Sequence, residues 1–141
     1  MGGENGMGAW GTGNLDNDRV RDWLADLEAP EGVERALHAV VGAAEEAYLD
    51  ADACCAALGA AEIVAACGGQ PVGALPEKVS AWVAANRGAV GGRVRDLAVA
   101  AVQRVEASSE LRDLFDEEGP NQAWHGVLEY VLGRLSVARF T

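Results

Sequence analysis

Apolar residues recur along this chain at intervals of three and four, the spacing that places side chains on one face of an α-helix. One such stripe, with Trp23 as an expected core residue, lies before Pro30. A second, which includes Tyr48, predicts a helix from Pro30 to about Leu49. Five further stripes lie at about 52–67, 76–86, 94–108, 109–119 and 120–139. Asp50 and Asp52 are natural caps for the first of these helices, and Ser109 for the fourth. No run of β-branched residues alternates with polar ones, as a strand would require. The sequence therefore predicts an all-α fold, a compact single-domain bundle of about seven helices.

The helix predicted over 52–67 is apolar on nearly all sides, which is typical of a central helix. From Ala53 to Pro76 the only charged residue is Glu62. A carboxylate in such a helix is at least partly buried, and it must be neutralised, paired or bound. Two interpretations stay open. Either Glu62 is a structural group paired with an arginine or a helix end, or it lines a small-ligand pocket in contact with solvent, helped by Asp52 and Trp10.

A second polar cluster lies on the helix predicted from Pro30. Glu34, His38 and Glu45 are spaced at i, i+4 and i+11, which places them along one flank of the apolar stripe. A row of two carboxylates and an imidazole resembles a metal site, but it lacks the Glu-x-x-His spacing of di-iron bundles. We interpret it as a rim of helix-surface pairs, and we expect no metal or other cofactor. His125 has no visible nucleophile partner.

The glycine-rich opening "MGAWGTGNLDND" (7–18) admits a ligand loop or a helix start. "GMGAWG" satisfies the GxGxxG pattern, but no strand precedes it and no helix follows at once. A calcium loop is excluded because Arg19 and Ala25 replace its glycine and its bidentate glutamate. The simpler interpretation is a capped helix start, with Asp16 as the N-cap and Asp18 in the first turn. Trp10 would then anchor a Gly/Trp-containing N-terminal arm packed on the bundle.

Charge and composition restrict the function. The 141 residues carry a net charge of −11, which argues against binding to nucleic acid. Residues 1–67 hold 13 acidic and 3 basic side chains, whereas residues 68–141 hold 9 and 8. The acidic half suits a partner protein with a basic surface, although a solvated acidic face is the simpler interpretation. Three cysteines without metal spacing, no membrane span and no signal peptide favour a cytoplasmic protein.

Several segments together resemble a known family, including "MGAWGTGNLDND", "VRDWLADLE", "LPEKVSAWV" and "SSELRDLFDEEGPNQAWHGVLEYVLGRL". The chain resembles, from Met7 onward, the bacterial family catalogued as domain of unknown function 4259. This resemblance implies a single helical domain over 7–141 and a flexible extension over 1–6, and it carries over no catalytic residue. We expect a non-catalytic, regulatory or immunity-like interaction module. The alternative is a small enzyme or ligand-binding protein that uses Glu62.

Overall fold

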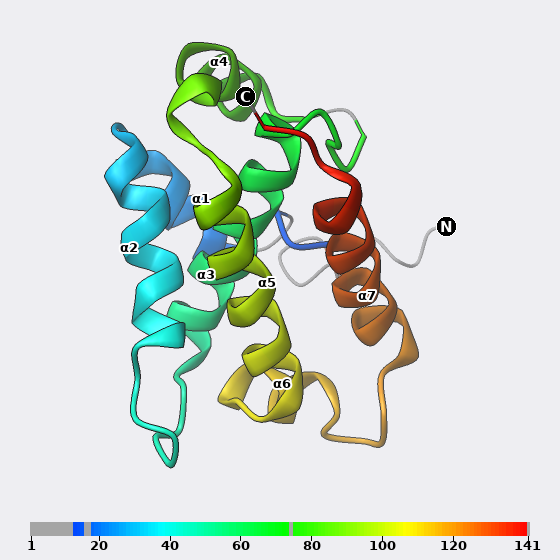
Figure 1. Ribbon diagram of the computed structural model, residues 1–141. Helices are drawn as coiled ribbons and strands as arrows, with labels where there is room; N and C mark the ends of the chain where they lie inside the picture. Colours follow the sequence, from blue (N-terminus) through cyan, green and yellow to red (C-terminus); the bar gives the residue numbers. More distant parts are fainter. Residues whose placement is uncertain (1–12, 16–17, 74, 141) are drawn as a thin grey trace.

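The computed structural model describes residues 13–15, 18–73 and 75–140, and the regular secondary structure in this part of the chain is helical (Figure 1). Within these residues seven α-helices follow one another, with a 3-10 turn at Arg87–Ala89 before α5. The helices are α1 (Asp18–Asp26), α2 (Pro30–Val41), α3 (Ala51–Cys67), α4 (Glu77–Asn86), α5 (Gly92–Ala107), α6 (Glu110–Phe115) and α7 (Gln122–Val137). The predicted all-α bundle of seven helices is confirmed. The arm that contains Trp10 lies outside the described residues.

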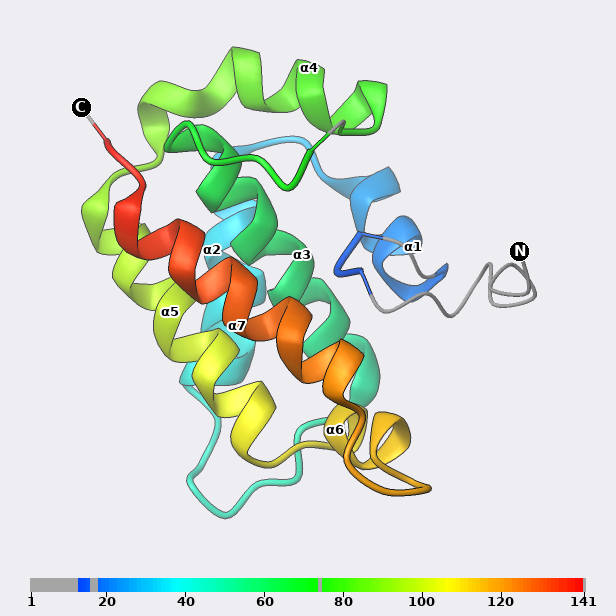
Figure 2. The same ribbon diagram turned by 90° about the vertical axis from the view of Figure 1, so that its right-hand side faces the viewer.

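Helix α3 is the centre of the bundle, as its sequence predicts. It packs against α1, α2, α4, α5, α6 and α7, and Figure 2 shows it enclosed between α7 in front and α2 behind. From Cys54 to Cys67 every residue except Ala56 is buried. Nine of the seventeen residues in α3 are alanine or glycine, and such small side chains let neighbouring helices approach closely. The apolar surface removed from water around α3 is therefore the main stabilising contribution in the core.

Side chains at the predicted positions cap several helices. Asp50 accepts a hydrogen bond from the backbone N–H of Ala53 at the start of α3 (2.8 Å). The Ser109 hydroxyl likewise accepts from the backbone N–H of Arg112 in α6 (3.0 Å). Helix α7 begins at Gln122, two positions after the predicted start at Pro120, and the side chain of Asn121 caps it by accepting from the backbone N–H of Trp124 (3.0 Å). These bonds satisfy backbone donors that a helix start leaves without partners.

Helix α2 ends at Val41, eight residues before the predicted end near Leu49. Glycine at position 42 favours termination, and the guanidinium of Arg104 from α5 binds the freed carbonyl groups of Val40 (3.0 Å), Ala43 (2.6 Å) and Ala44. Residues 42–50 therefore form a loop. The prediction that Tyr48 belongs to the apolar stripe was wrong, because its side chain is 64% exposed.

Basic side chains from neighbouring elements bind carbonyl groups at or just beyond the ends of other helices in the same way. A cation at this position compensates the negative end of the helix dipole. The donors and acceptors are Lys78 to Ala25, Arg87 to Cys67, Arg95 to Leu135, Arg112 to Ala107 and Arg134 to Gln70. Together with Arg104, six of the eleven basic residues are engaged with the backbone. Three of these residues, Arg95, Arg112 and Arg134, also pair with a carboxylate.

No helix in the described ranges is both long enough and apolar enough to span a membrane.

Candidate binding groove

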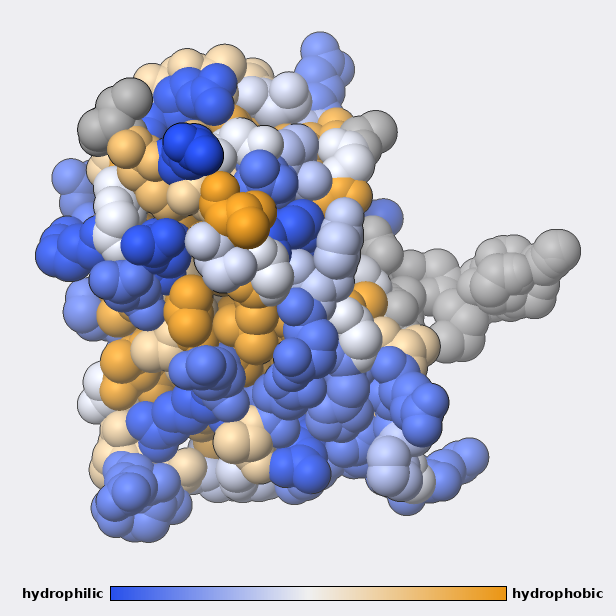
Figure 3. Space-filling view, turned by 45° about the vertical axis from the view of Figure 1, so that its right-hand side comes forward, coloured by the Kyte–Doolittle hydropathy of each residue, from blue (hydrophilic) through white to orange (hydrophobic). Residues whose placement is uncertain are grey.

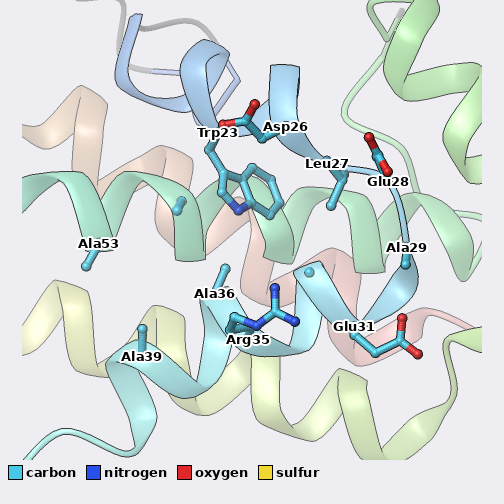
Figure 4. Close-up of a pocket in the computed structure, with 12 residues that line it drawn as sticks. Trp23, Asp26, Leu27, Glu28, Ala29, Glu31, Arg35, Ala36, Ala39 and Ala53 are labelled. Atoms are coloured by element: carbon cyan, nitrogen blue, oxygen red, sulfur yellow. The ribbon is translucent and has the colours of Figure 1, made fainter.

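Helices α1 and α2 diverge over α3 and leave a groove of about 660 Å³ between them. Figure 4 shows Trp23 and Asp26 on the α1 side, Arg35 and Ala36 on α2, and Ala53 on α3 behind them. The groove is lined by Trp23, Asp26, Leu27, Glu28, Ala29, Glu31, Gly32, Arg35, Ala36, Ala39, Ala53 and Ala56. All of these residues belong to the acidic N-terminal half of the chain.

Small side chains give the groove its depth. Ala36 and Ala39 of α2 and Ala53 and Ala56 of α3 present only methyl groups, so the space above them stays unfilled. The indole of Trp23 is half-buried and forms the apolar wall on the α1 side. The groove therefore offers an apolar surface and an aromatic face to an occupant, features that are common in binding sites.

Gly59 of α3 sets the position of Trp23. A Cβ atom at this glycine would overlap the Cγ2 atom of Val20 and would lie 3.5 Å from the Trp23 ring. Only glycine lets α1 approach α3 this closely without displacing Val20. The close packing of α1 at Gly59 thus fixes the wall of the groove from beneath.

Helix α4 fixes the connection between α1 and α2. The indole Nε1 of Trp82 donates to the backbone carbonyl of Glu28 (2.9 Å), and the Lys78 ammonium donates to the carbonyl of Ala25 (3.0 Å). The acceptor of each hydrogen bond is a backbone carbonyl group, so neither bond uses the side-chain carboxylate of Glu28 at the rim. These two hydrogen bonds hold the backbone in place at Ala25 and Glu28, at the end of the groove.

The charged residues of the groove are three acids and one base. Asp26, Glu28 and Glu31 lie along its rim, while the guanidinium of Arg35 points into the space between α1 and α2 (Figure 4). The rim thus carries a net charge of −2. Further along α1, Asp18 and Asp22 are exposed. Arg19 and Arg21 lie on the same helix, and Arg21 is 3.9 Å from Asp18. The excess of acids among the residues that line the groove favours a cationic over an anionic ligand.

Glu62 lies elsewhere, in the core beneath α7. Its side chain is 1% exposed, and its carboxylate is 2.9 Å from the Nη2 atom of Arg134. The amide of Asn14 donates a further hydrogen bond to Oε2 (2.8 Å). Glu62 does not line the groove, so the structure does not bring it into the solvent-accessible pocket that the ligand-binding interpretation requires. Of the two interpretations of Glu62, the structural one includes a pairing with an arginine, and the structure has such a pair.

The two residues proposed to accompany Glu62 are not assembled with it. Asp52 lies near the start of α3, ten positions before Glu62, with its side chain 81% exposed and paired to Arg19 (3.2 Å). Trp10 lies outside the described residues. Glu62 is buried and Asp52 faces solvent, so the two carboxylates cannot contact the same substrate.

The predicted polar row is divided because α2 ends early. Glu34 lies on α2 and pairs with Arg93 of α5 (2.8 Å), and His38 is exposed on α2. Glu45 lies in the following loop, so its expected place on the same helix face was wrong. Among the described residues, no group of three or more His, Cys, Asp or Glu side chains is arranged to hold a metal ion.

A cluster that the sequence did not reveal surrounds His125 at the junction of α5, α6 and α7. Its Nδ1 atom lies 2.8 Å from Oε2 of Glu106, and its Nε2 atom lies 2.9 Å from Oδ2 of Asp116. Arg112 also reaches Asp116 (3.3 Å), and the ring of Trp124 stacks on Phe115 with centroids 5.2 Å apart. Glu106 and His125 are nineteen positions apart in the sequence, so no local motif indicates this contact.

Hydrogen bonds to both carboxylates favour the charged imidazolium, so the pKa of His125 is raised, first by Asp116 and then by Glu106. Partial burial alone would raise the pKa of Asp116, but hydrogen bonds from the Asn121 backbone, His125 and Arg112 lower it overall. The pKa of Glu129 is raised because its carboxyl group shares a hydrogen bond with Glu106. The cluster is thus a charge network that joins three elements. No nucleophile takes part in it.

Cys54 and Cys67 offer no reactive thiol. Burial raises the pKa of Cys54 and of Cys67 to about 11, which keeps both thiols protonated near neutral pH. Cys54, Cys55 and Cys67 are all buried, and none of them forms a disulfide bond. They pack as small apolar residues of α3.

The fold and the groove define the class of this protein as a small all-α bundle with an acidic groove walled by Trp23. The comparison with known families agrees with the resemblance in the sequence. Residues 8–126 match the family described as "Domain of unknown function (DUF4259)", and the chain belongs to this family. The match begins one residue after Met7 and ends in the first turns of α7. Searches of the curated proteins and of the solved structures find no match.

Proposed function

We propose that this protein is a non-catalytic interaction module of the cytoplasm, and that the groove between α1 and α2 binds a basic, amphipathic segment of a partner protein. The single observation that carries this proposal is the combination in one groove of the half-buried Trp23, an alanine-lined apolar floor and an acidic rim. An amphipathic helix laid in a groove is an established mode of peptide recognition. Its apolar side chains would pack on Trp23 and the alanines.

The charge of the groove supports a basic rather than an acidic partner. The carboxylates of Asp26, Glu28 and Glu31 outnumber the guanidinium of Arg35, and the surrounding half of the chain is strongly acidic. Lysine or arginine side chains on the polar face of the bound segment would face these carboxylates. Rim charges of this kind act mainly on the association rate and on specificity, and their effect weakens as salt screens them.

The test uses the intact chain and three synthetic peptides of equal length, labelled with a fluorophore for anisotropy. The first forms an amphipathic helix with leucines on one face and arginines on the other. The second has the same composition in scrambled order, and the third replaces the arginines with glutamates. We expect binding of the first peptide that weakens steeply with salt, weaker binding of the scrambled peptide, and none of the acidic one.

Matched variants locate the binding site. Neutralising Glu28 and Glu31 together, as Glu28→Gln and Glu31→Gln, should weaken binding of the arginine peptide by about tenfold. Neutralising Glu45 and Glu46, exposed in the loop after α2, makes the same change in net charge away from the groove. Equal affinity for the ordered and scrambled peptides, or an equal effect of the two double variants, would show generic charge attraction and contradict the proposal.

The alternative function, an enzyme or ligand-binding protein that uses Glu62, gains no support from its surroundings. The side chain is 1% exposed and its carboxylate is engaged with Arg134 and Asn14. A general acid or base must reach the proton that it transfers. We therefore assign Glu62 to the core.

A further inference from the structure

Helix α7 carries a line of exposed, uncharged residues on its outward face. They are spaced by four, three and four positions, with the exposed Glu129 beside them: Gly126, Tyr130, Gly133 and Val137. Tyr130 is 56% exposed and Val137 is 58% exposed. We call these four residues the α7 seam. Figure 2 shows α7 lying across the front of the molecule, and Figure 3 shows apolar side chains gathered among charged ones on the side that carries α5 and α7.

The two glycines of the α7 seam have no packing reason within the described part of the chain. A Cβ atom built on Gly126 or on Gly133 meets no described atom within 4 Å. Both glycines also have ordinary helical backbone, since neither has a positive φ. Glycine inside a helix is unfavourable relative to alanine. Glycines that are costly to the helix and face open space are suited to the close approach of another helix.

The spacing of the α7 seam is that of a coiled-coil contact. Alternating steps of four and three residues place side chains on a narrow line that faces a partner helix. Large residues occupy one set of positions, Tyr130 and Val137, and glycines occupy the other. In an antiparallel helix pair the two sets face each other across the contact, so large residues meet small ones.

We propose that the α7 seam binds a second copy of this chain, with the two α7 helices antiparallel about a two-fold axis. An axis between Val131 and Leu132 places Tyr130 opposite the second copy's Gly133. The same axis places Val137 opposite the second copy's Gly126. Both side chains of each pair then fit a space of complementary size, as an isologous interface requires. One two-fold axis thus pairs each large residue of the seam with a glycine of the second copy. We take this as the reason to propose a second copy rather than an unrelated partner.

The absence of charge on the four seam residues permits this occupant. Two copies with a net charge of −11 each repel one another, and the uncharged seam lets them meet without burying carboxylates. Tyr130 is also held in place, because the guanidinium carbon of Arg134 lies 4.3 Å from its ring centroid. Glu129 lies at the edge of the contact rather than within it. The seam is on α7 and the groove is between α1 and α2, so this proposal stands independently of the proposed function.

The size of the contact sets the expected strength. Helix α7 has 16 residues, about 24 Å of length at 1.5 Å per residue. A contact made by one such helix from each copy falls at the low end of interface sizes, below about 1,200 Å² in total. We therefore expect an equilibrium between monomer and dimer that depends on protein concentration.

Sedimentation velocity of the purified full chain, from micromolar to millimolar concentration, tests the proposal. We expect the mass to rise from 14.6 kDa towards twice this value. Gly133→Gln should weaken association by about tenfold or more, because the added side chain occupies the space of the opposing Tyr130. The monomer should stay folded, since glutamine favours helix over glycine and meets open space. Far-UV circular dichroism checks this.

Ala100→Gln, on the exposed face of α5, is the matched control and should leave association unchanged. Added salt should strengthen association by screening like charges, the opposite of its effect on peptide binding in the groove. A wild-type protein that stays at 14.6 kDa throughout overturns the proposal. So does a dimer that Gly133→Gln does not weaken.

Discussion

The carboxylate of Glu62 on α3 and the guanidinium of Arg134 on α7 form an ion pair in the core, between residues 72 positions apart. The Nη2 atom of Arg134 lies 2.9 Å from Oε1 and 3.0 Å from Oε2 of Glu62, and the two side chains are 1% and 7% exposed. Arg134 also donates to the backbone carbonyl of Gln70 (3.1 Å). One polar contact thus joins the central helix, the last helix and the loop after α3.

Removing one member of this pair should destabilise the fold strongly. Glu62→Gln leaves the Arg134 guanidinium buried without its counter-ion, and we expect a loss of about 3–5 kcal/mol in the free energy of unfolding. Chemical denaturation followed by circular dichroism measures it. Glu46→Gln, an exposed acid in the loop after α2, is the control and should change stability by less than about 0.5 kcal/mol.

A double variant separates burial of charge from loss of a contact. Glu62→Leu with Arg134→Met replaces the pair by apolar side chains, and we expect it to be more stable than either single variant. If the loss of unfolding free energy in the double variant equals the sum of the losses in the two single variants, a direct interaction between these residues is contradicted.

Gly59→Ala should disturb the wall of the groove. The new methyl group overlaps the Cγ2 atom of Val20, so the Val20 side chain or α1 must shift. We expect a loss of about 1–3 kcal/mol in unfolding free energy and a shifted Trp23 fluorescence spectrum. Gly88→Ala, where the added Cβ meets no described atom within 4 Å, is the control. An unchanged stability and spectrum in Gly59→Ala would show that α1 does not pack against α3 as described.

The His125 cluster should make stability depend on pH. Since its pKa is raised in the folded state, the stabilisation is complete below the ordinary value of 6.5 and is lost as pH rises through the folded value. Asp116, with a lowered pKa, contributes above its ordinary value of 3.8 and loses its contribution as pH falls further. The difference in unfolding free energy between wild type and His125→Gln should therefore be largest between these two values. We expect about 1 kcal/mol or less there, because the groups are partly exposed.

Glu129 provides an internal check on this cluster. Its raised pKa reflects its closeness to Glu106, so at neutral pH the two carboxylates repel one another. Glu129→Gln should stabilise the protein slightly at pH 7 and have no effect at pH 4. A pH-independent difference for His125→Gln, together with a neutral Glu129→Gln, would mean that no charge network joins α5, α6 and α7.

Arg104→Gln should loosen the end of α2. The variant loses the charged donor that binds the carbonyl groups of Val40, Ala43 and Ala44. We expect a loss of about 1.5–3 kcal/mol, the range for hydrogen bonds to charged groups, and faster amide hydrogen exchange in the last turn of α2. Arg139→Gln, on the exposed C-terminal segment, is the comparison. Unchanged exchange in α2 would contradict the capping role of Arg104.

Local pattern was sufficient for most of the fold. Apolar spacing and capping residues predicted the number of helices, the Asp50 and Ser109 caps and the central place of α3, because these depend on neighbours in sequence. The end of α2 was mispredicted because it depends on Arg104, some sixty positions away. Apolar spacing past Gly42 suggested helix, whereas a guanidinium from α5 satisfies the backbone there.

The candidate site was predicted less well for the same reason. The sequence indicated that Glu62 would be buried and offered an arginine as its partner, but nothing local identified Arg134. The acidity of the N-terminal half was visible in composition, whereas the groove depends on how α1 and α2 diverge over α3. Trp23 was assigned to the core, and the structure instead leaves its ring half-buried at the groove. The charge network of His125 needed three elements brought together.

The most direct test of the central claim follows the indole N–H resonance of Trp23 by two-dimensional NMR of ¹⁵N-labelled protein, assigned with Trp23→Phe. The arginine-rich amphipathic peptide is added, and the buried Trp124 on α7 is the internal reference. The account predicts that the Trp23 resonance shifts with saturation while that of Trp124 does not, and that Glu28→Gln with Glu31→Gln moves saturation to higher peptide concentration. A saturating interaction that leaves the Trp23 resonance in place would contradict the claim that the groove is the binding site.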